Sequence, residues 1–304
     1  MPVGDLSVVI ATCDRAAVLL QTIDQLLCLD TPPMEIIVVD QSAVIDDVSR
    51  SALEAHDQQG NINWIRRTRR SIPAAMNHGL LVANAGVVLF LDDDVRIECE
   101  LVAAHAAAHA REGVEMVVGQ VIQPWQQPLG DDEPEYHGGK ANDPDAFRFN
   151  ATRGQKVRRF MGGNVSVRRS AVIELGGFDE NFVGAAYRFE AEFSQRFCDR
   201  GFEIYFEPAA CIYHLKAPHG GTRGFGQYLA PWHSTGRYYY WLSFPRIPGL
   251  FRNTLFEALQ CTIGRRHLRT PWLVIPSACA ELSGFMLAIY HRLRGPRLPL
   301  GNSR

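Results

Sequence analysis

The first 120 residues alternate short apolar runs with longer amphipathic stretches. The runs are rich in Val and Ile, which predicts strands, and the stretches between them repeat apolar residues at helical spacing. Strands that alternate with helices are typical of a parallel sheet with crossover helices on its faces. The predicted strands cover 6–11, 35–40, 61–66 and 87–91, and the predicted helices cover 15–29, 46–58 and 72–84.

The pattern becomes irregular over 123–160, where Pro, Gly, Asp and Gln predict loops that rim a site. Beyond this segment we expect a strand over 162–168, a helix from 170, a turn over 176–180, a helix over 188–200 and two short strands over 203–206 and 210–214. The apolar stretch 272–290 is about as long as a membrane span. Because Pro276 and Glu281 interrupt it, we expect a buried or interfacial helix instead.

Composition is ordinary for a globular protein, with 46% apolar and 21% charged residues in a chain of 304. It excludes fibrous, disordered and disulfide-scaffold classes. The 7 cysteines lack CxxC or metal-finger spacing, which favours reduced thiols. The first residues show neither a basic leader nor a long apolar core. We therefore expect a cytoplasmic protein.

The net charge of −2 combines two unlike parts. Residues 223–304 contain 11 arginines, no lysine and 2 acids, Glu257 and Glu281, a net of +9 that leaves −11 for residues 1–222. The whole chain has no basic field that would favour nucleic acid, so we expect no nucleic-acid partner.

Polar residues follow the predicted strands, at the edge where parallel sheets bind their ligands. They include Thr12, Asp14, Arg15, Asp40, Asp92, Asp93 and Asp94. The sequence has no GxGxxG after the first strand and no GxxxxGK[ST], which removes the main support for dinucleotide and P-loop sites. Three adjacent carboxylates raise one another's pKa, and a divalent cation shared with nucleotide phosphates would offset that cost. The alternative is a solvated acidic turn.

Seven segments in order carry a family resemblance: SVVIATCDR, EIIVVDQS, the helix with Asn77, VVLFLDDDV, GGNVSVRRS, GGFDENF and RFEAEFSQR. Over about residues 5–222 they resemble the nucleotide-sugar-dependent glycosyltransferases of family 2. The resemblance implies the GT-A fold, an α/β architecture with a Rossmann-like, mostly parallel sheet flanked by helices, here followed by a C-terminal helical extension. It also implies a catalytic domain over 1–222, with a nucleotide-sugar half (1–120) and an acceptor half (121–222), and the extension over 223–304.

The resemblance further implies a set of residues that bind the nucleotide sugar: Thr12, Asp14, Arg15, Asp40, Arg70, Asn77, Asp92, Asp93, Gly163 and Asn164. Asp40 would bind the base, although an aspartate there also suits a cap of the next turn. A solvated basic turn is the alternative for Arg70, and a β-bulge is the alternative for the glycines before Asn164.

Asp92 and Asp94 match the outer members of the family's DxD motif, which implies Mg²⁺ or Mn²⁺ bound with the donor diphosphate. Members of this fold commonly add a late histidine as a metal ligand. His214 resembles it in position, with His219 as the second choice and a purely structural histidine as the alternative.

Glu190 matches the position of the family's catalytic Asp. In RFEAEFSQR, Glu192 and Arg196 align with the family's ED-x-D/E-L/F-x-x-R signature, and Phe189 stands where the family often has Glu. A carboxylate there would remove the acceptor's hydroxyl proton, which implies inversion at the anomeric carbon. On helix statistics alone, Glu190 would be a solvated surface residue.

These features predict transfer from a UDP- or dTDP-type sugar to a hydroxyl of a glycan, polysaccharide or lipid-linked acceptor. A nucleotidyltransferase of related fold and a non-catalytic carbohydrate-binding relative are the alternatives. The aromatic and arginine-rich extension, over 225–304, suits peripheral contact with the inner face of the membrane, a cap on the catalytic domain or a homodimer.

Overall fold

The computed structural model describes residues 5–130, 147–221 and 229–301. The strands are β1 (Ser7–Thr12), β2 (Glu35–Asp40), β3 (Asn63–Arg66), β4 (Val87–Leu91), β5 (Val95–Ile97), β6 (Val114–Ile122), β7 (Gln155–Val157), β8 (Asn164–Arg168) and β9 (Glu203–His214). The helices are α1 (Ala16–Leu27), α2 (Asp47–Gln58), α3 (Ile72–Val82), α4 (Leu101–His109), α5 (Arg169–Glu174), α6 (Phe189–Asp199), α7 (Trp232–Ser243), α8 (Leu250–Ile263) and α9 (Val274–Arg294). Two 3₁₀ turns, Arg265–Leu268 and Pro271–Leu273, link α8 to α9.

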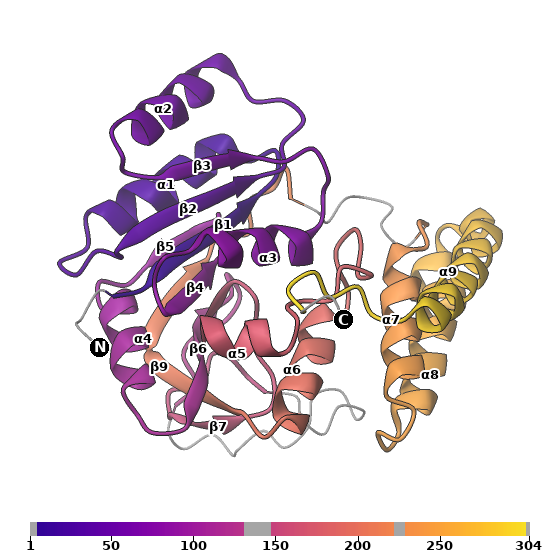
Figure 1. The fold of residues 1–304 in the computed structure, drawn as a ribbon. Coiled ribbons are helices and arrows are strands. Elements are labelled where there is room, and N and C mark those ends of the chain that lie inside the picture. Colours follow the sequence, from indigo (N-terminus) through magenta and orange to yellow (C-terminus); the bar gives the residue numbers. More distant parts are fainter. Residues whose placement is uncertain (1–4, 131–146, 222–228, 302–304) are drawn as a thin grey trace.

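The strands form one sheet in the order β3-β2-β1-β4-β8-β6-β9-β5, and β7 pairs with β9 beside this path. The half built from β3, β2, β1 and β4 is parallel, as predicted. In the other half β8 runs antiparallel to β4 and β6, while β6 and β9 are parallel. The sheet as a whole is therefore mixed, with helices on both faces (Figure 1).

Alternation along the strands divides the interior between two faces of the sheet. In β1, Val9 joins a core shared with α3, α5 and α6, while Val8 and Ile10 join a second core shared with α1, α2 and α4. Successive strand side chains point to opposite faces, so the central strands β1 and β4 contribute to both layers. This three-layer packing explains why the strands read as nearly continuous apolar runs.

Strand β9 corrects one expectation, since the two short strands predicted over 203–206 and 210–214 form one strand. Its pairing with β6 passes from Gly119↔Glu207 to Gln120↔Cys211, which leaves residues 208–210 as a bulge. Pro208 lacks an N–H for a sheet ladder, which fits a bulge better than regular pairing. The bulge carries the strand on to His214.

The C-terminal helices α7, α8 and α9 lie together beyond α6 (Figure 1). Among the described residues, Pro271–Arg294 is the one helical stretch long and apolar enough to cross a membrane. Pro276 lies in the first turn of α9, where a proline costs no helical hydrogen bond. The predicted domain boundary at 222/223 lies outside the described residues.

After α9 the chain returns to the sheet part. Glu180 N–H donates to Arg297 O at 3.0 Å, and Leu300 N–H donates to Gly176 O at 3.0 Å. Leu300 is buried in the core that contains Phe178. The extension is thus packed on the turn predicted over 176–180.

Candidate active site

The ends of β4 and β9 bring three predicted ligands together. The ligand atoms of Asp92, Asp94 and His214 all lie within 4.8 Å of one another. His214 Nε2 is 3.1 Å from Asp94 Oδ1 and 3.8 Å from Asp92 Oδ2. Asp94 is buried, whereas the Asp92 side chain is 49% exposed, so the cluster opens toward solvent on the Asp92 side.

Gln123 orients the histidine, and sequence reasoning did not identify it. His214 Nδ1 lies 3.0 Å from Gln123 Oε1. An amide oxygen only accepts, so Nδ1 donates this bond, and Nε2 is the ring nitrogen that faces the carboxylates. The irregular segment after β6 gave only a general indication of a rim, since a lone glutamine after a strand has no metal signature.

Asp94 is held from three sides. Its Oδ2 accepts from Ala217 N–H at 2.8 Å and lies 3.1 Å from the Arg15 guanidinium, while Oδ1 faces His214. Burial alone would raise the pKa of Asp94, but His214, the Ala217 N–H and Arg15 together lower it. The carboxylate is therefore anionic and fixed in direction.

Asp93 faces the interior, and its predicted role in the donor pocket stays a prediction. Thr12 Oγ1 donates to Asp93 Oδ2 at 2.6 Å, and Arg15 donates to Oδ1 at 3.0 Å. Burial raises the pKa of Asp93 to about 6, even though both partners lower it. Thr12 is buried too. The Thr12 hydroxyl and the Asp93 carboxylate are thus used to join β1 to the turn after β4.

The predicted lip of the nucleotide pocket is built around Asp14, which has the left-handed φ of 55°. Its Oδ1 accepts from Ala43 N–H at 3.0 Å, and its Oδ2 pairs with Arg70 at 2.7 Å. Both side chains of the pair are substantially exposed, at 33% and 48%. Arg15 instead turns its guanidinium onto Asp93 and Asp94.

Asp40 is buried and already bonded. Its Oδ1 accepts from Ser42 N–H at 2.8 Å, which is the turn cap considered from the sequence, and its Oδ2 accepts from Trp64 Nε1 at 3.1 Å. The cap does not test the predicted contact with the base, which stays a prediction.

Asn77 and Asn164 are both buried and bonded within the protein. Asn77 accepts from Phe178 N–H at 2.8 Å and donates to Phe178 O at 2.9 Å, which clamps the turn over 176–180. Asn164 donates to Gln120 O and Ala210 O, and its Oδ1 lies 2.9 Å from His105 Nε2. Both amides therefore support neighbouring backbone segments, and their predicted contact with the nucleotide sugar stays a prediction.

Glu190 and Asp92 meet across two glycines. Gly162 N–H donates to Glu190 Oε1 at 2.6 Å, and Asp92 N–H donates to Gly163 O at 3.1 Å. A Cβ on Gly163 would lie 2.1 Å from Asp92 Oδ2, so only glycine fits there. This junction brings the predicted base beside the acidic cluster.

The rest of the RFEAEFSQR segment supports helix α6. Arg196 pairs with the buried Glu192 at 2.5 Å and donates to Leu175 O and Gly177 O. Phe189 makes edge contacts with Phe160 and Phe178. The departure at Phe189 from the family's usual Glu thus fills the core, and Glu190, in the same first turn, is half-buried.

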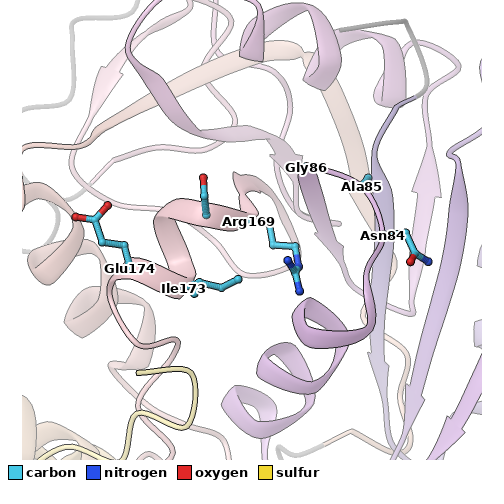
Figure 2. A pocket seen from close by; sticks show the side chains of 7 residues that line it. Asn84, Ala85, Gly86, Arg169, Ile173 and Glu174 are labelled. Atoms are coloured by element: carbon cyan, nitrogen blue, oxygen red, sulfur yellow. The ribbon is translucent and has the colours of Figure 1, made fainter. Parts of the chain in front are cut away.

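A surface pocket of about 490 Å³ lies elsewhere, where β4 begins and α5 runs past it (Figure 2). Its lining includes Asn84, Arg169 and Glu174. Arg169 already donates to Leu80 O at 2.8 Å. Because Asp92 and Asp94 follow the opposite end of β4, this pocket is separate from the acidic cluster.

Solved glycosyltransferases share the fold of this chain. PcManGT, a mannosyltransferase from Pyrobaculum calidifontis solved with GDP-Man and Mn²⁺, is 18% identical with a TM-score of 0.55, over 95% of this chain and 82% of that one. GalNAc-T7, solved with UDP, GalNAc and Mn²⁺, is 16% identical with a TM-score of 0.60, over 87% and 57%. S. aureus TarS is 14% identical with a TM-score of 0.55, over 86% and 44%.

At these identities the similarity shows the fold, and the chain spans little more than half of GalNAc-T7 and less than half of TarS. No curated protein sequence matches this one. The model of glycosyl transferase family 2 matches residues 7–176, which is more than half of the chain. The chain therefore belongs to glycosyl transferase family 2 and is a glycosyltransferase with the GT-A fold.

Proposed function

We propose that this glycosyltransferase moves a sugar, with inversion, from a nucleoside-diphosphate sugar of the UDP or dTDP type to a hydroxyl of a glycan, polysaccharide or lipid-linked acceptor. The observation that carries the proposal is the close approach of Asp92, Asp94 and His214, with Glu190 across the Gly162–Gly163 junction.

The donor atoms fit a divalent cation. Two carboxylates and the Nε2 of His214 form an oxygen and nitrogen set that suits Mn²⁺, and the carboxylates alone would suit Mg²⁺. When bound, such a cation supplies positive charge to the departing diphosphate. The names of two structural neighbours include Mn²⁺, which supports this choice.

The donor would enter between the Asp14–Arg70 pair and Asp92. Arg70 is exposed and paired with one carboxylate, so its guanidinium fork can exchange that partner for a phosphate. Asp40 would bind the nucleobase of the donor, since it lies at the end of β2 on the same edge of the sheet.

Glu190 would act as the general base that accepts the proton of the acceptor hydroxyl. The bond from Gly162 N–H orients Oε1, and a carboxylate has about four acceptor positions in all. The acceptor oxygen bonds to the anomeric carbon while the bond from that carbon to the phosphate oxygen breaks, and the hydroxyl proton passes to Glu190. Attack opposite the leaving group inverts the centre.

We further propose that residues 1–222 form the catalytic domain, with a nucleotide-sugar half and an acceptor half, and that the protein works at the cytoplasmic side. The packing of Phe189 supports catalysis over a carbohydrate-binding role, because the unusual residue is a core residue and the acidic positions are kept. Membership of family 2 also disfavours a nucleotidyltransferase.

The test is a screen of UDP-, dTDP- and GDP-sugars for binding and hydrolysis with Mn²⁺, with Mg²⁺ and with chelator. We expect one donor class to be favoured and to need metal, loss of that dependence in Asp94→Asn, and loss of transfer with retained donor binding in Glu190→Gln. Equal donor binding with and without metal would contradict the proposed cation site. Undiminished transfer by Glu190→Gln would remove the base.

A further inference from the structure

The two last helices expose large apolar side chains. On α9, Ile275, Leu282 and Met286 are 75%, 65% and 58% exposed, and on α8, Phe256, Leu259 and Ile263 are 51%, 50% and 63% exposed. The helices pack on each other. We call these six side chains the apolar face.

The opposite side of α9 carries small residues. Ser277, Ala280, Gly284 and Ala288 are buried at helical spacing, and a Cβ on Gly284 would collide with Ser234 of α7. In an ordinary surface helix the large apolar residues face the core and the polar ones face water. Here the small residues face the protein and the large ones face outward, so the apolar face is not the edge of a core.

The two acidic side chains of the extension both point toward the rest of the protein. Glu257 accepts from Arg188 at 2.5 Å and from Tyr187 Oη at 3.0 Å, and Glu281 pairs with the buried Arg237. These are the only acids in residues 223–304, and both are turned toward the protein.

Exposed arginines lie on α8 and α9 and in the segment between them, near the residues of the apolar face. Arg252 lies on α8, Arg269 precedes α9, and Arg292 and Arg294 lie in its last turn. Since both acids of the extension are paired inward, the exposed surface of the described residues 229–301 combines apolar side chains with positive charge.

We propose that the apolar face docks on an anionic phospholipid membrane, with α8 and α9 lying along its surface. Apolar side chains that enter the headgroup boundary and arginines that meet anionic lipids act together in such binding. A second copy fits less well, because two of these faces would bring arginines against arginines. A spanning α9 would carry the Glu281–Arg237 pair, and α7 with it, into hydrocarbon.

The docking itself is independent of the proposed chemistry. One consequence does rest on the proposed function: Glu257 on α8 holds Arg188, the residue just before α6, which carries Glu190 in its first turn. The membrane-bound helices would therefore adjoin the element that holds the proposed base, a placement suited to a lipid-linked acceptor.

The test is sedimentation of the full chain with phosphatidylglycerol–phosphatidylcholine vesicles and with phosphatidylcholine vesicles. We expect binding to the anionic vesicles that weakens as NaCl increases. The double variants Leu282→Ser/Met286→Ser and Arg292→Gln/Arg294→Gln should each bind at least about tenfold more weakly. The matched controls change exposed residues outside the C-terminal extension. Val44→Ser/Val48→Ser is the control for the apolar pair, and Arg50→Gln/Arg200→Gln is the control for the arginine pair.

Circular dichroism and donor binding in solution establish that each variant is folded, and they keep this test separate from the test of the chemistry. The proposal is overturned if the full chain does not sediment with anionic vesicles. It is also overturned if the apolar variants abolish a concentration-dependent dimer but leave vesicle binding unchanged, or if the bound protein resists extraction by alkaline carbonate and needs detergent, as a spanning helix would.

Discussion

At the scale of single residues, Gly162 and Gly163 separate the proposed base from the first ligand carboxylate. Their backbone groups bond to Glu190 and Asp92 in opposite directions, so a small movement of this junction changes both. The sequence predicts that Gly163 binds the nucleotide sugar, with a β-bulge as the alternative. The structure adds the physical reason, since Asp92 occupies the space that a side chain on Gly163 would need.

Gly163→Ala should lower kcat/KM by about 100-fold, because displacement of a reacting or ligating group by about 1 Å costs on that order. Gly162→Ala is the matched control: its Cβ would lie 3.3 Å from Glu190 Oε1, a contact that small adjustments relieve, and we expect a loss of under about threefold. Initial rates at several Mn²⁺ concentrations measure both. Equal effects of the two variants would contradict this account.

Gln123→Leu should weaken activation by Mn²⁺ by about 10- to 100-fold, since the acceptor that fixes His214 is lost. The Mn²⁺ concentration at half-maximal transfer is the measurement, and excess Mn²⁺ should restore most of the rate. Gln127→Ala, an exposed glutamine in the same segment, should leave the value unchanged. A fall in rate that no amount of Mn²⁺ corrects would instead show that Gln123 does not act through His214 and the metal.

The sequence identified the polar residues at the strand ends but did not show in which direction each side chain points. Asp92, Asp94 and His214 come together as expected, but nothing in a run of three aspartates says that the middle one turns inward to Thr12. That choice depends on the bend between β4 and β5 and on two partners from distant sequence, the Thr12 hydroxyl and the Arg15 guanidinium, which meet Asp93 there.

At the scale of elements, α4 was not predicted, because its sequence LVAAHAAAH has small residues on every side and little amphipathic contrast. Its two histidines, His105 and His109, are buried and share the Ser166 hydroxyl, at 2.8 and 2.9 Å. Burial lowers the pKa of His105 to about 4 and that of His109 to about 3, and Arg168 contributes to the second shift. Both imidazoles are neutral in the folded protein at pH 7.

Stability should therefore fall as pH drops from about 6.5 toward 4, since the unfolded chain binds protons on these histidines before the folded chain does. The loss is on the order of 2 kcal/mol per histidine at pH 5. Urea unfolding at pH 7.5, 6 and 5 measures it, and His105→Gln should flatten the dependence. An unchanged slope in that variant would show that other groups dominate acid unfolding.

At the scale of the whole molecule, several separate contacts join the C-terminal extension to the sheet part. Asp179 accepts from Tyr239 Oη at 2.7 Å and from Arg297 N–H at 2.9 Å, and Leu300 packs over the Gly176–Gly177 turn. The uneven charge along the chain suggested two parts in different surroundings. Charge alone contains no information about shared packing, so this junction could not be predicted.

Leu300→Ala should lower the free energy of unfolding of the whole chain by about 2 kcal/mol, because it opens a cavity beneath the 176–180 turn. Leu293→Ala, at a side chain that is 83% exposed, is the control and should change stability little. Urea unfolding followed by fluorescence and circular dichroism is the measurement. Two separate transitions, with only one affected by Leu300→Ala, would indicate that the extension unfolds independently.

The bulge in β9 has a thermodynamic consequence. Phe206 belongs to the core with α6 and Ile212 to the core with α4. The two are six residues apart, so in an uninterrupted strand their side chains would point to the same face of the sheet. The three extra residues, 208–210, reverse the alternation, so one strand serves both layers. Destabilisation by Phe206→Leu and Ile212→Val should add within about 0.5 kcal/mol, whereas Phe206→Leu and Val118→Ala, neighbours in one core, should not add. Two positions that look like one face would thus be energetically independent.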